Sequence, residues 1–541
     1  MRVSGFMRLL FGDRGNPDHL DGINLSRQEY TVARMLDKEW WNLELKFDKT
    51  PCRCLRCVTR EVRNVEQTQE IRLPDGMPDV GRVLCAWGQP MLRSKEWLGD
   101  GMTSSGGVMA WVLYAPDDGS APQWVDLWIP FQAKWNFPET QRDGVMRQVP
   151  VIRNVDARIV SARKLMVRAS VGVWAEALEP YELEVYTPGE PPEGVALLRN
   201  TYPVMIIKEA GEKAFLLDEE LILPGSCPPA EAVVRFELMP QLSDSRVMAG
   251  KVVFRGNGLL QILYRGEDGA FHTCEQEIPF SQFAELEEDM GADAEARIAF
   301  AVTNLELDKN EDGSLRLKCG LVGQYLIQDR VLLEIAEDAY SPHREVTPCF
   351  QSVTIPAVLE VRTEQIAGEV TLDAECSRIV DLAFWPDHPA VSRMGDQVRM
   401  SMSGVFQVLY EDLDGNLQSA ARHWEQEKGM EAAENCMMSG QMAPVGSPVA
   451  QTGGGSVTMR GNVAVAVHTE ATQGQSMLSG MELGEEKKPD QNRPSVILRR
   501  AEGERLWDIA KCCGTTVRSI CQANGLKDEP DPGRLLLIPV L

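Results

Sequence analysis

The sequence predicts a mainly β protein, in which three tandem antiparallel repeats of sandwich- or barrel-like form precede a small βααβ domain. The first observation behind this prediction is an internal repeat with a period of about 150 residues. The second is the alternation of apolar and polar residues in stretches that end at Asp-Gly pairs, which is typical of antiparallel strands joined by tight turns. The third is a change of pattern after residue 494, where helical spacing replaces the alternation.

The repeat is defined by landmarks that keep one offset. Leu73-Pro74 recurs as Leu223-Pro224, and Tyr114 recurs as Tyr264, each 150 residues later. Both tyrosines follow a leucine and precede Asp-Gly at the same distance, and an Ile-Pro-Phe motif follows in both copies. Tyr410 marks a third copy, which lacks the Leu-Pro and Ile-Pro-Phe landmarks. We therefore expect three related domains, the third of them divergent.

Asp-Gly pairs that follow apolar strands are expected to close β-hairpins. In residues 261–271, an apolar strand runs into Asp268-Gly269, and the same pattern leads to Asp312-Gly313. A type I′ turn needs positive φ, which glycine adopts without steric cost. The sequence therefore predicts tight two-residue hairpins, with Tyr264 packed against the core rather than placed for reaction.

Domain boundaries follow from segments rich in Pro, Gly and charge, which are typical of linkers. Such segments occupy residues 186–194, 336–348 and 480–494. The expected units are an N-terminal arm with a short helix (1–49), repeats at 50–185, 195–336 and 345–475, a linker at 476–494 and the C-terminal domain at 495–541. The helix of the arm would carry Trp40-Trp41, either packed on the first repeat or docked on a partner.

Composition and charge limit the possible partners. The chain has 43% hydrophobic and 25% charged residues, as in soluble globular proteins, and its net charge is −25. This charge opposes binding to nucleic acid and to anionic lipid. No apolar run reaches the ~18 residues of a transmembrane segment, and the N-terminus lacks the pattern of a secretory signal. We therefore expect a cytoplasmic protein.

The cysteines suggest a reducing compartment. Thirteen is an odd number, and most of them stand singly in apolar stretches. Cys52, Cys54 and Cys57 are the exception, because three thiolates so close together could bind zinc. A structural zinc site needs four ligands, however, and no second Cys or His pair follows at the usual spacing. We interpret the three as reduced thiols on a strand, and we expect no metal and no cofactor.

The chain shows no pattern that predicts catalysis. It contains no phosphate-binding loop that ends in Gly-Lys-Ser/Thr, no HExxH motif and no G-x-S-x-G motif. Its six histidines stand singly. We therefore expect a protein that is not an enzyme.

Tryptophan is concentrated in the first third of the chain, where nine of the twelve precede residue 175. Trp124 and Trp128 would share one face of a regular strand. These tryptophans either fill the core or form an aromatic contact surface for another protein, because Trp is enriched at interface hot spots.

The last residues predict a compact βααβ unit. Strands are expected at 496–499 and 535–538, on either side of two helices. The first helix spans 504–513, and Thr516 is a suitable N-cap for the second. Asn524-Gly525 would end that helix.

This unit resembles a LysM domain. The matching residues are Gly503, Leu506-Trp507, Ile509-Ala510, Gly514 to Val517, Asn524 to Leu526 and Gly533 to Pro539. The resemblance implies a shallow groove between the loop at 503–505 and the loop after the second helix, where LysM domains bind N-acetylglucosamine chains. The usual Gly-Asp-Thr turn is here Gly503-Glu504-Arg505, which changes the shape and charge of the groove.

The resemblance also implies a set of contact residues. The residues expected to bind a protein partner or a glycan are Ile497, Gly503, Glu504, Arg505, Leu506, Trp507, Asn524, Gly525, Leu526 and Lys527. Trp507 is either a contact residue or is buried between helix and sheet.

The three repeats, with their Leu-Pro, Leu-Tyr-x₃-Asp-Gly and Ile-Pro-Phe landmarks, resemble SPOCS domains of spore-coat proteins. Tandem SPOCS repeats that end in one LysM domain resemble the SipL-type coat morphogenesis proteins of spore-forming clostridia. This resemblance implies a scaffold in the mother-cell cytosol at the forespore surface, without catalysis. Its LysM domain would dock the morphogenetic ATPase of the coat, and its SPOCS repeats would recruit other coat proteins. The alternative is a cell-wall or cortex protein that binds peptidoglycan through the LysM domain.

Overall fold

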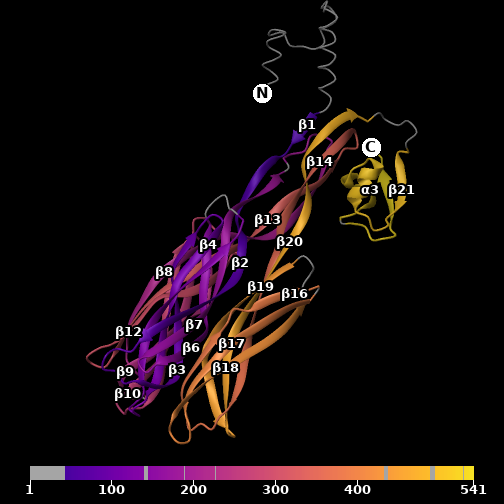
Figure 1. Ribbon diagram of the computed structural model, residues 1–541. Helices are drawn as coiled ribbons and strands as arrows, with labels where there is room; N and C mark the ends of the chain where they lie inside the picture. Colours follow the sequence, from indigo (N-terminus) through magenta and orange to yellow (C-terminus); the bar gives the residue numbers. More distant parts are fainter. Residues whose placement is uncertain are drawn as a thin grey trace, which may run out of the picture.

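The computed structural model describes residues 43–138, 144–187, 189–225, 227–395, 397–431, 436–487, 494–527 and 529–540. The predicted N-terminal helix with Trp40-Trp41 lies outside these residues. The described chain is almost entirely β, as the sequence predicted, and forms an elongated body with a small helical unit beside one end (Figure 1). The two helices of the described chain have eight residues each, and no helix in these ranges is long and apolar enough to cross a membrane.

Each repeat begins and ends with a long strand and carries a three-stranded meander in between. The first contains β2 (Asp48–Arg72), β3 (Val80–Trp97), β4 (Gly101–Pro116), β5 (Gln123–Asn136), β6 (Val145–Ser161) and β7 (Lys164–Thr187). The second contains β8 (Ala196–Leu221), β9 (Ala230–Met248), β10 (Lys251–Gly266), β11 (Phe271–Glu285), β12 (Glu295–Lys309) and β13 (Leu315–Tyr340). The third contains β14 (Arg344–Asp373), β15 (Arg378–Pro386), β16 (Ala390–Met394), β17 (Gln397–Glu411), β18 (Leu417–Glu431), β19 (Cys436–Gly453) and β20 (Ser456–Glu486).

Strand pairing shows that the repeats are equivalent. The meanders pair in the orders β3-β4-β5 and β9-β10-β11, and in the third repeat β17 pairs with β15, β16 and β18. The long strands pair in the order β2-β7-β6, and the equivalent strands pair as β8-β13-β12 and β14-β20-β19. The first two of these sheets join where β2 meets β8, at Leu55 and Ile207, so they form one six-stranded sheet.

Each repeat is a sandwich whose core lies between its meander and its long strands. In the first repeat, Leu113 of β4 and Val167 of β7 belong to one buried cluster. In the second, Ile262 of β10 and Leu317 of β13 share another. Inward-facing residues alternate with outward-facing ones, as the sequence pattern predicted, because successive side chains of a strand point to opposite faces.

The long strands continue beyond the sandwiches and form a stalk (Figure 1). β20 has 31 residues and, at about 3.3 Å per residue, spans roughly 100 Å. β1 (Leu43–Lys46) pairs with its far end, between Gly480 and Leu483. Within the stalk, Leu183 of β7 and Ile335 of β13 lie in a separate buried cluster.

Two segments predicted as linkers are strand instead. β13 continues to Tyr340 and β14 begins at Arg344, so only residues 341–343 separate the second and third repeats, inside the expected linker 336–348. β20 continues to Glu486, through much of the expected linker 476–494. The charged residues of these segments led to the linker prediction. A strand that is paired on both sides can nevertheless carry charged side chains where they face solvent.

Asp268-Gly269 and Asp312-Gly313 close hairpins, but not through the predicted type I′ turn. Gly269 has φ of 80°, whereas no described residue other than glycine has positive φ. The Gly269 N–H donates to the Gly266 carbonyl, and the Gly266 N–H donates to Ala270, each at 2.9 Å. This is a type I turn followed by a left-handed glycine, a G1 bulge. Asp268 retains negative φ because its Oδ1 accepts the Ala270 N–H at 3.0 Å and stabilises the type I turn.

The repeated tyrosine packs in the core, as predicted. Tyr114 and Tyr264 are fully buried, and their hydroxyls donate to the carbonyls of Pro78 (3.1 Å) and Pro228 (3.0 Å). Both acceptors lie just after the Leu-Pro landmark. Burial raises the pKa of Tyr264, so its phenol stays protonated and remains a donor. The repeated tyrosine is therefore hydrogen-bonded to the segment that follows the Leu-Pro landmark in both repeats.

Replacement of Tyr264 by Phe is expected to cost about 1 kcal/mol, the usual net value of one hydrogen bond. The loss should be measured as a lower urea midpoint for the transition in which the second repeat unfolds. Tyr410→Phe is the matched control, because Tyr410 is half-buried and its hydroxyl has no hydrogen bond within the described chain. Equal losses in both variants would contradict the assigned role.

The tryptophans of the first repeat divide between its core and its contact with the second repeat. Trp87 and Trp135 are buried in the first core. Trp111 contacts Phe236 of the second repeat with ring centres 5.2 Å apart, and the Arg265 guanidinium lies 5.1 Å from the centre of the Trp124 ring. The sequence predicted that these tryptophans either fill the core or contact another protein. In the structure, Trp111 and Trp124 also contact the neighbouring repeat.

Candidate docking site

The C-terminal unit has the predicted βααβ order. It consists of β21 (Val496–Arg500), α3 (Leu506–Cys513), α4 (Val517–Asn524) and β22 (Leu535–Pro539). Thr516 caps α4 by accepting the Ser519 N–H at 3.1 Å, and Gly525 ends it with φ of 62°. Gly514 ends α3 in the same left-handed conformation. Both glycines relieve the steric cost that another residue would meet there.

α3 begins two residues later than predicted, at Leu506 instead of Glu504. Gly503 has φ of 98° and Arg505 is extended, so the chain turns sharply before the helix. Arg505 makes no side-chain cap. The Leu506 N–H donates instead to the Glu529 carboxylate, at 2.7 Å, from the loop between α4 and β22. A carboxylate stabilises a helix N-terminus through its unpaired N–H groups and its dipole.

The predicted contact residues do not form one exposed group. Leu506 and Trp507 are buried, Ile497 and Leu526 are half-buried, and Arg505, Gly503, Gly525 and Lys527 are exposed. Asn524 holds the unit together, because its amide donates to the Leu537 carbonyl at 2.6 Å and accepts the Leu537 N–H at 2.7 Å. Glu504 pairs with Arg499 at 2.7 Å.

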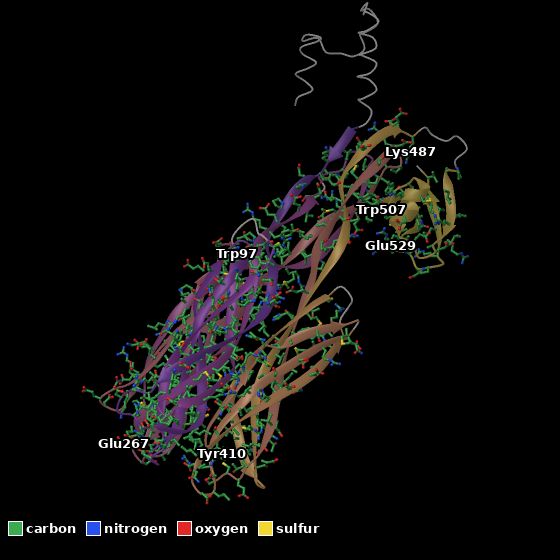
Figure 2. All side chains as sticks on the ribbon, in the orientation of Figure 1. Trp97, Glu267, Tyr410, Lys487, Trp507 and Glu529 are labelled. Carbon is green, nitrogen blue, oxygen red and sulfur yellow. The ribbon has the colours of Figure 1, made fainter. Side chains whose placement is uncertain are left out.

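Trp507 faces the stalk. Its ring lies edge-on to Tyr340 of β13, with centres 4.6 Å apart, and its indole N–H donates to Asp338 at 2.8 Å. Lys511 pairs with the same carboxylate at 2.8 Å, and the Tyr340 hydroxyl donates to the Thr515 carbonyl at 3.0 Å. We call these contacts of Asp338 and Tyr340 with α3 and Thr515 the latch. Figure 2 shows Trp507 on the side of the unit that faces the stalk.

The latch residues on the stalk, Asp338 and Tyr340, lie next to a β-bulge in β13. The register between β13 and β8 shifts between Ala336 and Asp338, so Glu337 is the extra residue. A bulge redirects side chains. Glu337 accepts hydrogen bonds from Asn200 (2.7 Å) and Gln475 (3.1 Å), while Asp338 reaches α3. No sequence signal indicated this role, because the residues lie in a segment that was predicted as a linker.

The opposite face of the unit is apolar and exposed. Leu498 of β21 is directly opposite Leu537 of β22, and their side chains are 65% and 39% exposed. Val496 and Leu535, which share this face, are 45% and 58% exposed. Ile497, Leu536 and Ile538 point the other way, into the core of the unit. We call the face formed by Val496, Leu498, Leu535 and Leu537 the outer face.

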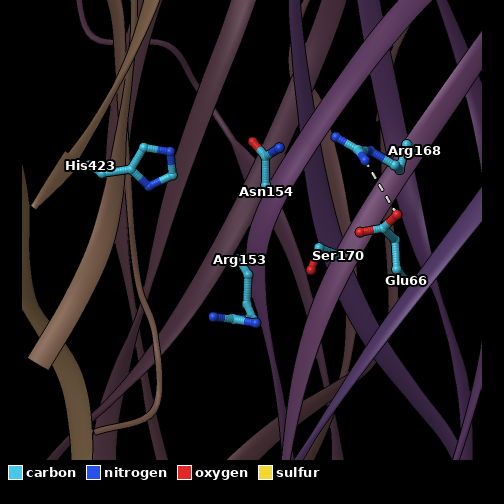
Figure 3. A pocket seen from close by; sticks show the side chains of 6 residues that line it. All are labelled: Glu66, Arg153, Asn154, Arg168, Ser170 and His423. Atoms are coloured by element: carbon cyan, nitrogen blue, oxygen red, sulfur yellow. Dashed lines mark hydrogen bonds and ion pairs between the residues drawn. The ribbon is translucent and has the colours of Figure 1, made fainter. Parts of the chain in front are cut away.

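Two clefts lie between the first and third repeats. The smaller, of about 210 Å³, is lined by Glu66, Arg153, Asn154, Arg168, Ser170 and His423 (Figure 3). Arg168 contacts Glu66 at 3.3 Å and Asp156 at 2.9 Å, so its charge is compensated within the first repeat. His423 of β18 lies across the cleft from this pair (Figure 3).

The larger cleft, of about 440 Å³, includes Arg153, Asp387 and His388 in its lining. Arg153 pairs with Asp387 across the boundary between repeats at 2.6 Å. His388 Nε2 lies 3.0 Å from the Val149 carbonyl, and burial lowers the pKa of this histidine, so the neutral ring donates there. The charged and polar groups of this cleft therefore hold the repeats together.

The three clustered cysteines lie on β2. Burial raises the pKa of Cys54 to about 11 and that of Cys57 to about 12, so both thiols are protonated at neutral pH. Protonated thiols are poor metal ligands and poor nucleophiles. Within the described ranges, no three His, Cys, Asp or Glu side chains are grouped to hold a metal ion.

Comparison with known protein families gives a match in the second repeat. Residues 229–309 match the family model described as SipL, SPOCS domain, and this segment runs from β9 to β12 of the second repeat. No curated protein and no solved structure matches the chain. The match supports the relation that the repeated landmarks predicted, in one of the two repeats that carry all of them. The second repeat is therefore similar to the SPOCS domain of the SipL family, a family associated with sporulation.

Proposed function

We propose that this protein is a non-enzymatic adaptor in assembly of the bacterial spore coat. Its LysM-like unit would dock the morphogenetic ATPase of the coat, and its SPOCS-like repeats would recruit other coat proteins at the forespore surface in the mother-cell cytosol. The observation that carries this proposal is the outer face of the unit, where four apolar side chains are exposed while the opposite side packs on the stalk. The match in the second repeat supports the sporulation context.

The geometry also favours a protein partner over a glycan. In a LysM domain the glycan groove lies between the loop before the first helix and the loop after the second. Here Glu529 bridges these two loops through its hydrogen bond to the Leu506 N–H, and Trp507 is engaged in the latch. The outer face, by contrast, exposes four apolar side chains beside Arg500, which suits a protein surface better than a polar sugar chain.

The proposal predicts that the variant Leu498→Asp with Leu537→Asp weakens binding of the purified coat ATPase at least tenfold, which corresponds to about 1.4 kcal/mol. The physical reason is that a carboxylate in an apolar interface must lose its hydration without a partner. Binding should be measured with the full chain immobilised. Leu332→Asp is the matched control, because Leu332 is 67% exposed on β13, away from the unit.

A chain that ends before residue 495 should capture no ATPase. Unchanged capture by this truncated chain would refute the docking role. Binding of the full chain to peptidoglycan, lost on Trp507→Ala, would instead support the glycan alternative.

A further inference from the structure

A buried row of charges crosses three strands of the first repeat. Arg60 of β2 and Arg147 of β6 are the cross-strand neighbours of Glu176 on β7. Arg60 lies 2.6 Å from one carboxylate oxygen of Glu176, and Arg147 lies 2.8 Å from the other. Arg60 also pairs with Glu470 of β20 at 2.7 Å and donates to Ser439 of β19 at 2.9 Å. The row therefore joins the first repeat to the third.

The second repeat reaches the same place through β12. Arg147 Nη2 lies 3.5 Å from the backbone carbonyl of Arg297, and the charge of the Arg297 guanidinium is close enough to Glu176 and Glu470 to interact with both. His468 of β20 is buried beside the same arginines. All three repeats thus meet at one buried group, which we call the three-repeat junction: Arg60, Arg147, Glu176, Arg297, Ser439, His468 and Glu470.

The junction has more positive than negative charge. It holds three guanidinium groups and two carboxylates, which leaves one positive charge uncompensated. Burial lowers the pKa of His468 to about 3, and the neighbouring arginines add to this effect, so the imidazole is neutral. The nearby Cys57 thiol is also neutral, because burial raises its pKa to about 12.

Several donors of the junction have no hydrogen-bond partner among the described residues. They are Nε of Arg147 and Nε and Nη2 of Arg297, all of them buried, and Nδ1 of the neutral His468 ring likewise has no partner there. Arg147 as a whole is only 2% exposed. A buried donor without a partner costs about 1–3 kcal/mol, and more when it is charged. Burial also lowers the pKa of Arg297 to about 10, as expected of a cation without full compensation.

We propose that the three-repeat junction binds one small monovalent anion, of the chloride type, between Arg147 and Arg297. The anion supplies the single negative charge that the group lacks and accepts the unpaired N–H groups. It enters through the larger cleft, whose lining includes Arg60 and Ser439 at the edge of the junction. Because the two arginines belong to different repeats, the bound anion stabilises the contact between the first two sandwiches.

Thermal unfolding of the full chain tests this site, with sodium chloride exchanged for sodium gluconate at constant ionic strength. Gluconate is too large for a buried junction, and constant ionic strength keeps screening of surface charge the same. The melting temperature is expected to rise with chloride and to saturate, because a ligand that binds only the folded state stabilises it by mass action.

Arg297→Met should abolish this dependence. The substitution removes the excess charge and keeps much of the apolar stem, so the variant in gluconate should melt at the temperature of the native chain or above it. Arg316→Met is the matched control, because Arg316 lies on the surface, paired with Asp218, and chloride should still stabilise that variant. A native chain without a chloride response, or an equal response in Arg297→Met, would refute the site.

Crystals of the native chain grown in bromide give a second readout that needs no variant. An anomalous peak between Arg147 and Arg297 is the expected result. Peaks confined to surface arginines would overturn the proposal.

Discussion

Replacement of Glu176 by Gln is expected to destabilise the protein by about 3–5 kcal/mol, the usual cost of breaking a buried ion pair by removing one partner. Glu176 is 1% exposed and lies between Arg60 and Arg147. The neutral amide leaves both guanidinium groups buried without their shared counter-charge. The measurement is the urea midpoint of the first unfolding transition, because a chain of several domains need not unfold in one step.

The effect of Glu176→Gln should depend on pH in a defined direction. Burial alone would raise the pKa of Glu176, but Arg60 and Arg147 outweigh it and hold the pKa at about 2, below its ordinary 4.5. A lowered pKa contributes stability that is complete above about pH 4.5 and is lost as the pH falls towards 2. The difference between the native chain and the variant should therefore be constant near neutral pH and shrink in acid.

Glu184→Gln is the control for this prediction. Glu184 lies on the same strand but pairs with Lys49 at the surface, where solvent screens the pair. We expect no measurable change. A loss as large as that of Glu176→Gln would show that the effect comes from β7 in general and not from the junction.

Tyr340→Ala is expected to release the βααβ unit from the stalk. Tyr340 is 5% exposed, contacts Trp507 and donates to the Thr515 carbonyl. Removal of a buried aromatic side chain costs about 3–5 kcal/mol. Here the lost contacts are those of the latch, so the substitution weakens the packing of the unit on the stalk. Tyr340 lies on β13 and its ring packs against the core of the unit, so the substitution removes this contact while every residue of the two helices is kept.

Small-angle scattering and hydrogen exchange measure this release. The radius of gyration should rise, and amides at the latch should exchange faster while those inside α3 and α4 stay protected. Leu332→Ala is the matched control, because Leu332 lies on the same strand with 67% of its side chain exposed. Unchanged scattering for Tyr340→Ala would show that the unit is held by contacts other than the latch.

The local features of the fold were accessible from the sequence because they depend on neighbouring residues. Alternation predicted the inward and outward faces of the strands, and the constant offset of Tyr114 and Tyr264 predicted equivalent repeats. Thr516 and Gly525 marked the limits of α4 correctly. The type I′ turn was wrong because Asp-Gly also suits a type I turn with a left-handed glycine, and side-chain bonds of the aspartate favour the latter.

The candidate site was only partly accessible. The sequence identified the unit and singled out Trp507, but it left open whether this residue is exposed or buried. Its partners Asp338 and Tyr340 lie more than 160 residues away in the chain. They also lie in a charged segment that pattern alone assigns to a linker, because composition does not reveal the strand that pairs with it.

The sequence by itself determined the β class, the three repeats, the positions of the turns and the βααβ unit, because alternation, helical spacing and turn residues are local patterns. The tertiary structure decided which charges meet. Arg60, Arg297 and Glu470 stand on three different repeats, and only the packing of those repeats brings them into one buried junction. It also decided which side of the βααβ unit is free, since Asp338 and Tyr340 contact α3 and Thr515 while Leu498 and Leu537 stay exposed.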